Sequence, residues 1–296
     1  IDTDRFAALA PNLLGSCYGT RFLRGAGHAG APLAVTTRDM ARLAATLVDA
    51  LGVTRLALVA GGSLGGMVTL EHCATFPEGS RAAISFAAPA SPTAWGAAWN
   101  HIHRTAIEAA PRSGLALARM VGMLTYRTPG EVERRFRPST ADSHPVRDYL
   151  NHHGEKLVRR FATKSYLTLL DSMDAHNVAR GRGSVARALA AYRGSLVGVG
   201  IPGDLLYPPD EVLRWTRAAG VPYRELASPS GHDAFLLETE SVGSILAEAL
   251  RTGAPPPARL QPARVQPSAI AVVYFGVFPG SALASAESAV KALVGR

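Results

Sequence analysis

The spacing of hydrophobic residues in the first ninety positions predicts alternating helices and strands. Short apolar runs at 55–60 and 82–88 predict strands that are buried on both faces. Between them lie a glycine-rich turn at 61–66 and a helix over 67–76. A further helix is predicted over 38–51, where apolar residues share one helical face: Met40, Leu43, Ala44, Leu47 and Leu51. This alternation is typical of a parallel sheet with right-handed crossovers.

The middle of the chain, residues 91–192, contains no convincing strand pattern. Apolar and aromatic residues recur there at helical spacing instead: Val146, Tyr149, Leu150, His153 and Leu157, and then Tyr166, Leu170 and Met173. A helical block between two groups of strands is most simply an insertion over one end of the sheet. We therefore predict a helical lid.

Strand patterns return after the lid and divide the rest of the chain. We predict strands over 195–201 and 221–226 and helices over 209–219 and 241–250. The chain then divides into a first core part (1–90), the lid (91–192), a second core part (193–252) and a proline-rich linker with a C-terminal tail (253–296).

The tail contains an uncharged stretch, 268–286, that is long enough to raise the question of a membrane span. Gly276, Pro279 and Gly280 argue against a spanning helix and favour a strand, a glycine turn and the start of a helix. We interpret the tail as the start of a second domain or as a disordered segment.

Composition narrows the possible partners and the compartment. The 296 residues carry a net charge of +8, but they include only three lysines and no dense basic run, which argues against nucleic-acid binding. A positive surface equally suits a phosphorylated small molecule such as an acyl-CoA.

Cys17 and Cys73 lack metal-ligand spacing, and no signal segment precedes them, so we expect a reducing compartment, the cytoplasm. Because the chain lacks an initiator Met, we expect a fragment or a processed form.

The glycine-rich turn has the pattern G-x-S-x-G between a predicted strand and a predicted helix. In that context Ser63 is the candidate nucleophile, and Gly61 and Gly65 leave the space that a sharp turn requires. The helix N-terminus after Ser63 directs backbone N–H groups at a developing oxyanion, and Leu64 is the expected first donor. A phosphate-binding loop is the alternative, but the turn has neither a lysine nor G-x-G-x-x-G spacing.

A serine nucleophile needs a base and an acid, which follow it in the order Ser, Asp/Glu, His in enzymes with this turn. Asp204 follows the predicted strand 195–201, and His232 follows the predicted strand 221–226. Both therefore lie at the carboxyl ends of parallel strands, where open α/β sheets place their sites. The alternatives are a helix cap for Asp204 and a loop histidine for His232. The pairs His101/His103 and His152/His153 lack metal-ligand spacing, so we predict no metal site and assign them solvated or lid-packing roles.

Several segments resemble the homoserine O-acetyltransferase family of α/β-hydrolase-fold acyltransferases. The similar segments are NLLGSCYGT at 12–20, GGSLGGMVTLEHCATFPE at 61–78, GLALARM at 114–120, SYLTLLDSMD at 165–174, GDLLYPP at 203–209 and GHDAFLLE at 231–238. The resemblance covers about residues 1–250. It implies an α/β-hydrolase fold with a helical lid, and it places the first sheet strands and the second oxyanion donor upstream of residue 1.

The resemblance also implies a reaction and roles for further residues. The serine would take an acetyl group from acetyl-CoA, a substrate rather than a cofactor, and pass it to the hydroxyl of L-homoserine in methionine biosynthesis. Arg119 would hold the substrate carboxylate, Asp233 the ammonium group, and Tyr126 would line the pocket. A homodimer formed through the lid is expected, without a nucleic-acid or membrane partner. The alternatives are a homoserine O-succinyltransferase, a serine O-acyltransferase, an esterase and an inactive paralogue that acts as a scaffold.

Overall fold

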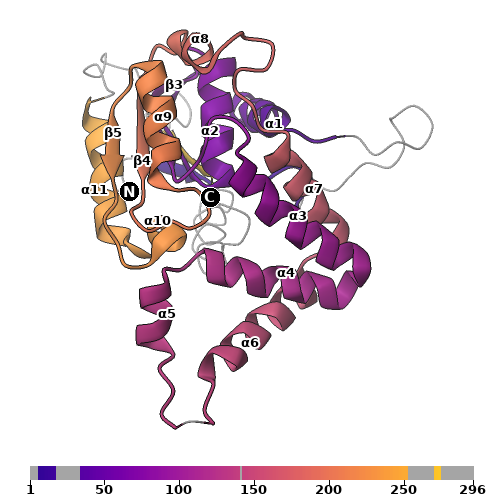
Figure 1. Cartoon of the computed structure of the whole chain (residues 1–296). Coiled ribbons are helices and arrows are strands. Elements are labelled where there is room, and N and C mark those ends of the chain that lie inside the picture. The colour runs from indigo at the N-terminus through magenta and orange to yellow at the C-terminus, as the bar shows by residue number, and fades with distance from the viewer. Residues whose placement is uncertain (1–5, 18–33, 141, 253–269, 275–296) are drawn as a thin grey trace, which may run out of the picture.

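The computed structural model describes residues 6–17, 34–140, 142–252 and 270–274, and a six-stranded sheet runs through them (Figure 1). The order of the strands is β1-β6-β2-β3-β4-β5, and every neighbouring pair is parallel. The strands are β1 (Ala7–Leu9), β2 (Leu56–Gly62), β3 (Ser80–Phe86), β4 (Ser195–Gly200), β5 (Tyr223–Glu225) and β6 (Ile270–Tyr274). The predicted parallel sheet is confirmed.

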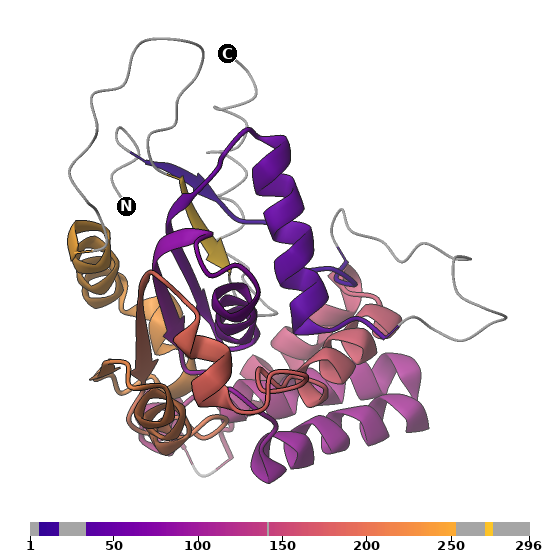
Figure 2. The same cartoon turned by 90° about the horizontal axis from the view of Figure 1, so that it is seen from above.

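Helices cover both faces of this sheet. One face packs against α11 (Thr239–Thr252), and the other packs against α1 (Thr37–Ala50), α2 (Leu64–Thr75) and α9 (Pro209–Ala219). Figure 2 shows α11 and α1 on opposite sides of the strands. Because β2 is flanked on both faces, all seven of its residues are buried, which explains its continuous apolar run.

The lid lies between β3 and β4, as predicted, and Figure 1 shows α4, α5 and α6 extending away from the sheet. Its helices are α3 (Ala94–Ala109), α4 (Pro111–Thr125), α5 (Pro129–Arg135), α6 (Pro145–Arg160), α7 (Thr163–Asp174) and α8 (Val185–Ala190). Ile107, Leu115 and Leu170 of the lid share one hydrophobic cluster with Leu64 and Met67 of α2. The lid is therefore packed directly over the start of α2.

Helix α1 begins at a capping box but buries a different face from the one predicted. The Thr36 hydroxyl accepts a hydrogen bond from the Asp39 N–H, and the Asp39 carboxylate accepts one from the Thr36 N–H. Met40 and Ala44 of the predicted face are buried, but the other three members are 39–51% exposed: Leu43, Leu47 and Leu51. The buried face shares Met40 and Ala44 with the predicted one but is rotated so that Thr37, Ala41 and Val48, which are 0–7% exposed, complete it.

The strand over 270–274 corrects our interpretation of the tail. We predicted a strand there as part of a second domain or a disordered segment. The structure places β6 inside the core sheet, between β1 and β2, with Val59 paired to Val272 and Leu9 to the same residue on the other side. β6 fills a position between β1 and β2, two strands that are far from it in sequence, and the local sequence around 270–274 does not show that this position exists. The predicted proline-rich linker, and the glycine turn and helix start predicted after residue 274, lie outside the described residues.

None of the helices in the described part of the chain is both long and apolar enough to cross a lipid bilayer.

A buried carboxylate ties α1 and α2 to the segment before α8. Glu71 on α2 is 2% exposed and accepts charged hydrogen bonds from Arg38 Nε at 3.0 Å and Arg182 Nη1 at 2.9 Å. Both arginines also reach backbone or hydroxyl oxygens, Arg180 O and Thr75 Oγ1. One buried charge therefore has two cations and holds three segments together.

Replacing Glu71 with glutamine is expected to lower the free energy of unfolding by about 3 kcal/mol, because two guanidinium groups then lose their counter-charge in a partly buried site. Urea unfolding measures this loss. The matched control is Glu78→Gln, an exposed glutamate in the turn between α2 and β3, which should change the free energy of unfolding by less than about 0.5 kcal/mol. Equal stabilities of the two variants would contradict this role for Glu71.

Candidate active site

Ser63 stands at a strained turn between β2 and α2. Its φ of 56° and ψ of −123° lie outside the regions that L-residues ordinarily occupy, a strain typical of functional turns. The turn is tight: a Cβ on Gly61 would lie 2.2 Å from the Gly65 carbonyl oxygen, so only glycine fits at position 61. The predicted requirement for glycine before the serine is confirmed there.

Helix α2 begins at Leu64, immediately after Ser63, and not at Met67 as its glycine-rich first turn led us to predict. Tertiary packing outweighs the low helix propensity of glycine at this point. As the first helical residue, Leu64 has an N–H without an intrahelical acceptor, and this group lies at the positive end of the helix. It is therefore available to an oxyanion that forms at Ser63, although its role stays a prediction.

Asp204 and His232 come together at the same edge of the sheet. Asp204 follows β4, and His232 lies in the short 3₁₀ turn Gly231–Asp233 after β5. His232 Nδ1 and Asp204 Oδ2 are 2.7 Å apart, and both residues are 3% exposed. The other oxygen of Asp204, Oδ1, accepts hydrogen bonds from the N–H groups of Leu206 and Tyr207 at 2.8 and 2.9 Å. The carboxylate is thus fixed on both sides.

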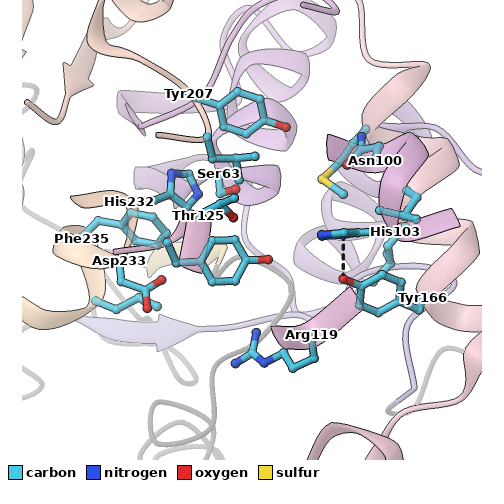
Figure 3. Close-up of a pocket in the computed structure, with 16 residues that line it drawn as sticks. Ser63, Asn100, His103, Arg119, Thr125, Tyr166, Tyr207, His232, Asp233 and Phe235 are labelled. Atoms are coloured by element: carbon cyan, nitrogen blue, oxygen red, sulfur yellow. Dashed lines mark hydrogen bonds between the residues drawn. The ribbon is translucent and has the colours of Figure 1, made fainter. Parts of the chain in front are cut away.

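His232 lies beside Ser63 in the same cavity (Figure 3). Its Nε2 is buried and has no hydrogen-bond partner within the described part of the chain, so it is available to the serine hydroxyl or to a substrate. Burial disfavours the charged imidazolium, but the charge and hydrogen bond of Asp204 outweigh it, and the pKa of His232 is raised. Three aromatic rings surround it with centroids 5.6–5.7 Å away: Tyr126, Tyr207 and Phe235.

Two charged residues predicted to bind substrate line the same cavity. Arg119 of α4 is 8% exposed, with its guanidinium carbon 5.8 Å from the Tyr126 ring centroid. Asp233 follows His232, and its Oδ2 lies 3.2 Å from Nη2 of Arg127. Burial raises the pKa of Asp233, against the opposing charges of Arg127, His232 and Arg119. The cavity therefore presents a cation and a carboxyl group together.

Tyr126, the third predicted pocket residue, also lines the cavity. Burial raises the pKa of its phenol to about 12, so the hydroxyl keeps its proton at neutral pH. The binding roles of Arg119, Asp233 and Tyr126 stay predictions, but the structure brings all three to the cavity that contains Ser63.

Sequence reasoning missed several residues of this cavity, which has a volume of about 80 Å³. Tyr207 and Phe235 lie inside the GDLLYPP and GHDAFLLE segments, and their positions beside Asp204 and His232 were an available signal. The lid supplies Asn100, Thr125, Tyr166, Leu169 and Met173, the last three inside the SYLTLLDSMD segment, and it also supplies His103, which no similar segment contains. His103 is 5% exposed, so a lid-packing role fits it and a solvated one does not.

Comparison with known proteins identifies the family. Residues 2–106 match a family model described as alpha/beta hydrolase fold. A homoserine O-acetyltransferase of Thermus thermophilus is 45% identical over 262 residues, which cover 83% of this chain and 68% of the relative. The chain belongs to the homoserine O-acetyltransferase family.

Solved structures agree with membership of the homoserine O-acetyltransferase family. The crystal structure of a homoserine O-acetyltransferase from Staphylococcus aureus superposes with a TM-score of 0.69 at 31% identity and covers 84% of this chain and 73% of its own. Esterase E22 superposes with a TM-score of 0.66 at 19% identity, over 74% and 67% of the two chains, which shows the shared fold alone. The predicted α/β-hydrolase fold and the predicted enzyme class are confirmed, and the succinyltransferase, serine acyltransferase, esterase and scaffold alternatives are not favoured.

Proposed function

We propose that this chain transfers the acetyl group of acetyl-CoA to the hydroxyl of L-homoserine, a step of methionine biosynthesis, through an acetyl-serine intermediate at Ser63. The observation that supports the mechanism is the Asp204–His232 pair beside a serine in a strained turn. The family supports the substrates, because relatives at 34–45% identity are named homoserine O-acetyltransferase. Acetyl-CoA enters as a substrate, and we expect no cofactor.

In the first half-reaction His232 acts as the base. Its Nε2 accepts the proton of the Ser63 hydroxyl while Oγ attacks the thioester carbonyl. The Leu64 N–H donates to the oxyanion that forms. When the C–S bond breaks, the CoA sulfur takes the proton from His232. The products are free CoA and an acetyl ester on Ser63.

In the second half-reaction the same imidazole activates the acceptor. His232 takes the proton of the homoserine hydroxyl, the hydroxyl oxygen attacks the acetyl-serine carbonyl, and Ser63 Oγ leaves with the proton from His232. Arg119 and Asp233 suit the two charged groups of an amino acid, since a guanidinium binds a carboxylate and a carboxylate binds an ammonium group. The lid packs over the start of α2 and limits water, which would otherwise hydrolyse the intermediate.

A substrate matrix tests this proposal. Acetyl-CoA and succinyl-CoA are each combined with L-homoserine, L-serine and water, and CoA release and ester product are measured. We expect acetyl-CoA with L-homoserine to give the highest kcat/KM, by at least about tenfold. Faster transfer from succinyl-CoA, or faster transfer to serine, would contradict the proposed substrates. Acetyl-CoA hydrolysis that L-homoserine does not redirect into O-acetylhomoserine would favour an esterase.

We also propose that the enzyme works in the cytoplasm as a homodimer joined through the lid. Both cysteines, Cys17 and Cys73, are free, which suits a reducing compartment. Three large apolar side chains on α3 and α4 are 44–50% exposed: Ile102, Leu117 and Leu124. Contact with a second copy would remove this apolar surface from water.

Light scattering tests the dimer. The protein is expected to have twice the mass of one chain, and Leu117→Glu is expected to shift it toward the monomer because a charge would be buried in the interface. Leu51→Glu, at the residue directly after α1, is far from the lid in sequence and similarly exposed, so it is the matched control and should leave the mass unchanged. A wild-type monomer, or a dimer equally weakened by both variants, would contradict a lid interface.

A further inference from the structure

A second buried histidine lies in the cavity, on the lid side and across from Ser63 (Figure 3). His103 of α3 is 5% exposed, and its Nδ1 lies 3.1 Å from the hydroxyl of Tyr166 on α7. Tyr166 is itself 3% exposed. The pair joins two lid helices at the cavity wall, and the mechanism above gives it no role.

The other ring nitrogen of His103 lacks a partner in the described part of the chain. Its Nε2 is buried and makes no hydrogen bond there, and Figure 3 shows the ring directed into the cavity toward the side that holds Ser63 and His232. A buried polar atom without a partner is costly, so in a native protein it points to a functional role or to a partner that enters the cavity. The position therefore indicates a contact that forms when the cavity is filled.

Charge around His103 limits what that contact can be. Burial and the positive charge of Arg119 lower the pKa of His103 to about 4, so the ring is neutral at pH 7 and carries one N–H. Arg119 lies near enough to influence both His103 and Tyr166. If the Tyr166 hydroxyl donates to Nδ1, the N–H is on Nε2 and points into a region that Arg119 makes favourable for an anion.

The length of the acceptor places its anionic end here. The homoserine hydroxyl must reach His232 and Ser63, so its carboxylate, at the other end of a four-carbon chain, extends away from them. We propose that His103, oriented by Tyr166, donates a hydrogen bond from Nε2 to the carboxylate of the acceptor amino acid, beside Arg119. This assignment rests on the proposed function and adds a specificity-determining residue to it.

Steady-state kinetics with two acceptors test the assignment. His103→Leu removes the donor, and we expect the KM for L-homoserine to rise about 10- to 100-fold, since the lost bond is to a charged group. His103→Gln returns an N–H donor and should recover most of the affinity. With 3-amino-1-propanol, which keeps the hydroxyl and the amine but lacks the carboxylate, wild type and His103→Leu should differ by less than about twofold.

Two further measurements separate this role from a structural one. The rate of Ser63 acetylation by acetyl-CoA alone should stay the same in His103→Leu, because the acceptor is absent. Tyr166→Phe removes the orienting hydroxyl and should raise the KM for L-homoserine about 3- to 10-fold, without an effect on 3-amino-1-propanol. It also provides the test if His103→Leu does not fold. The matched control is His101→Leu, an exposed histidine on the same helix, which should behave as wild type.

Several results would overturn the assignment. The first is an unchanged KM for L-homoserine in folded His103→Leu and Tyr166→Phe. The others are equal losses of kcat/KM with L-homoserine and 3-amino-1-propanol, and slower acetylation of Ser63 in His103→Leu. The proposed function fails separately: a wild-type enzyme that does not prefer L-homoserine to 3-amino-1-propanol contradicts it. A wild-type preference that is undiminished in folded His103→Leu and Tyr166→Phe contradicts only the role of His103.

Discussion

Replacing Ser63 with alanine is expected to lower kcat for acetyl transfer by about 10⁴-fold or more, because the nucleophile of both half-reactions is lost. Stability should change little. Alanine has the same Cβ in the same strained backbone, and the N–H of residue 63 still donates to Phe86 O at 2.9 Å. Activity is measured as O-acetylhomoserine formed, and stability as the midpoint of thermal unfolding.

The matched control is Ser113→Ala, an exposed serine on α4 of the lid, which should retain wild-type activity. A Ser63→Ala enzyme with more than a tenth of wild-type activity would show that Ser63 is not the nucleophile. Loss of activity together with loss of the folded state would mean that the turn was disrupted, and Ser63→Cys, which retains a nucleophile, then decides between the two causes.

Replacing Asp204 with asparagine is expected to lower kcat by about 10³- to 10⁴-fold. Asp204 Oδ1 accepts two backbone N–H bonds, so the amide oxygen of asparagine must keep that position and its NH₂ group must face His232. An NH₂ group cannot accept from Nδ1–H, so the imidazole is forced to carry its proton on Nε2. That tautomer cannot take a proton from Ser63.

The pH dependence gives a second readout for Asp204. The base form of His232 exists only above its pKa, which Asp204 raises, so the acid limb of kcat/KM lies above the ordinary histidine value of about 6.5. In Asp204→Asn the carboxylate charge is gone and burial still disfavours the imidazolium, so the acid limb should move to lower pH. Asp210→Asn, an exposed carboxylate on α9, is the control. An unmoved limb, or a loss below tenfold, would contradict this account of the pair.

The boundaries of a helix could be predicted where residues next to them, such as proline and glycine, determine where it begins and ends. Helix α9 begins and ends at the predicted residues, 209 and 219, because Pro209 suits a first helical position and Gly220, at φ 67°, suits the position after the last one. Strand β5 is shorter than predicted, three residues where 221–226 suggested six, because it lies at the edge of the sheet and pairs only with β4.

What depends on distant contacts was not predictable in this way. One example is β6, which lies between β1 and β2 because those two strands leave a position open. Another is α1, whose buried face is set by how the helix packs on the rest of the fold and not by its own apolar pattern. The same holds in the site. Ser63, Asp204 and His232 could be predicted because each follows a strand in a fixed order. His103 and Tyr166 lie on lid helices whose crossing is set by packing, and although Tyr166 lies inside the SYLTLLDSMD segment, nothing in the sequence places it beside His103.

The most direct test of the central claim, that the hydroxyl of Ser63 carries the acetyl group, is peptide mass spectrometry after mixing the enzyme with acetyl-CoA and no acceptor. The account predicts one added acetyl group on the peptide containing Ser63, its loss on addition of L-homoserine, and no label in Ser63→Ala. An acetyl group on another residue, or an unlabelled enzyme that still forms O-acetylhomoserine at full rate, would contradict it.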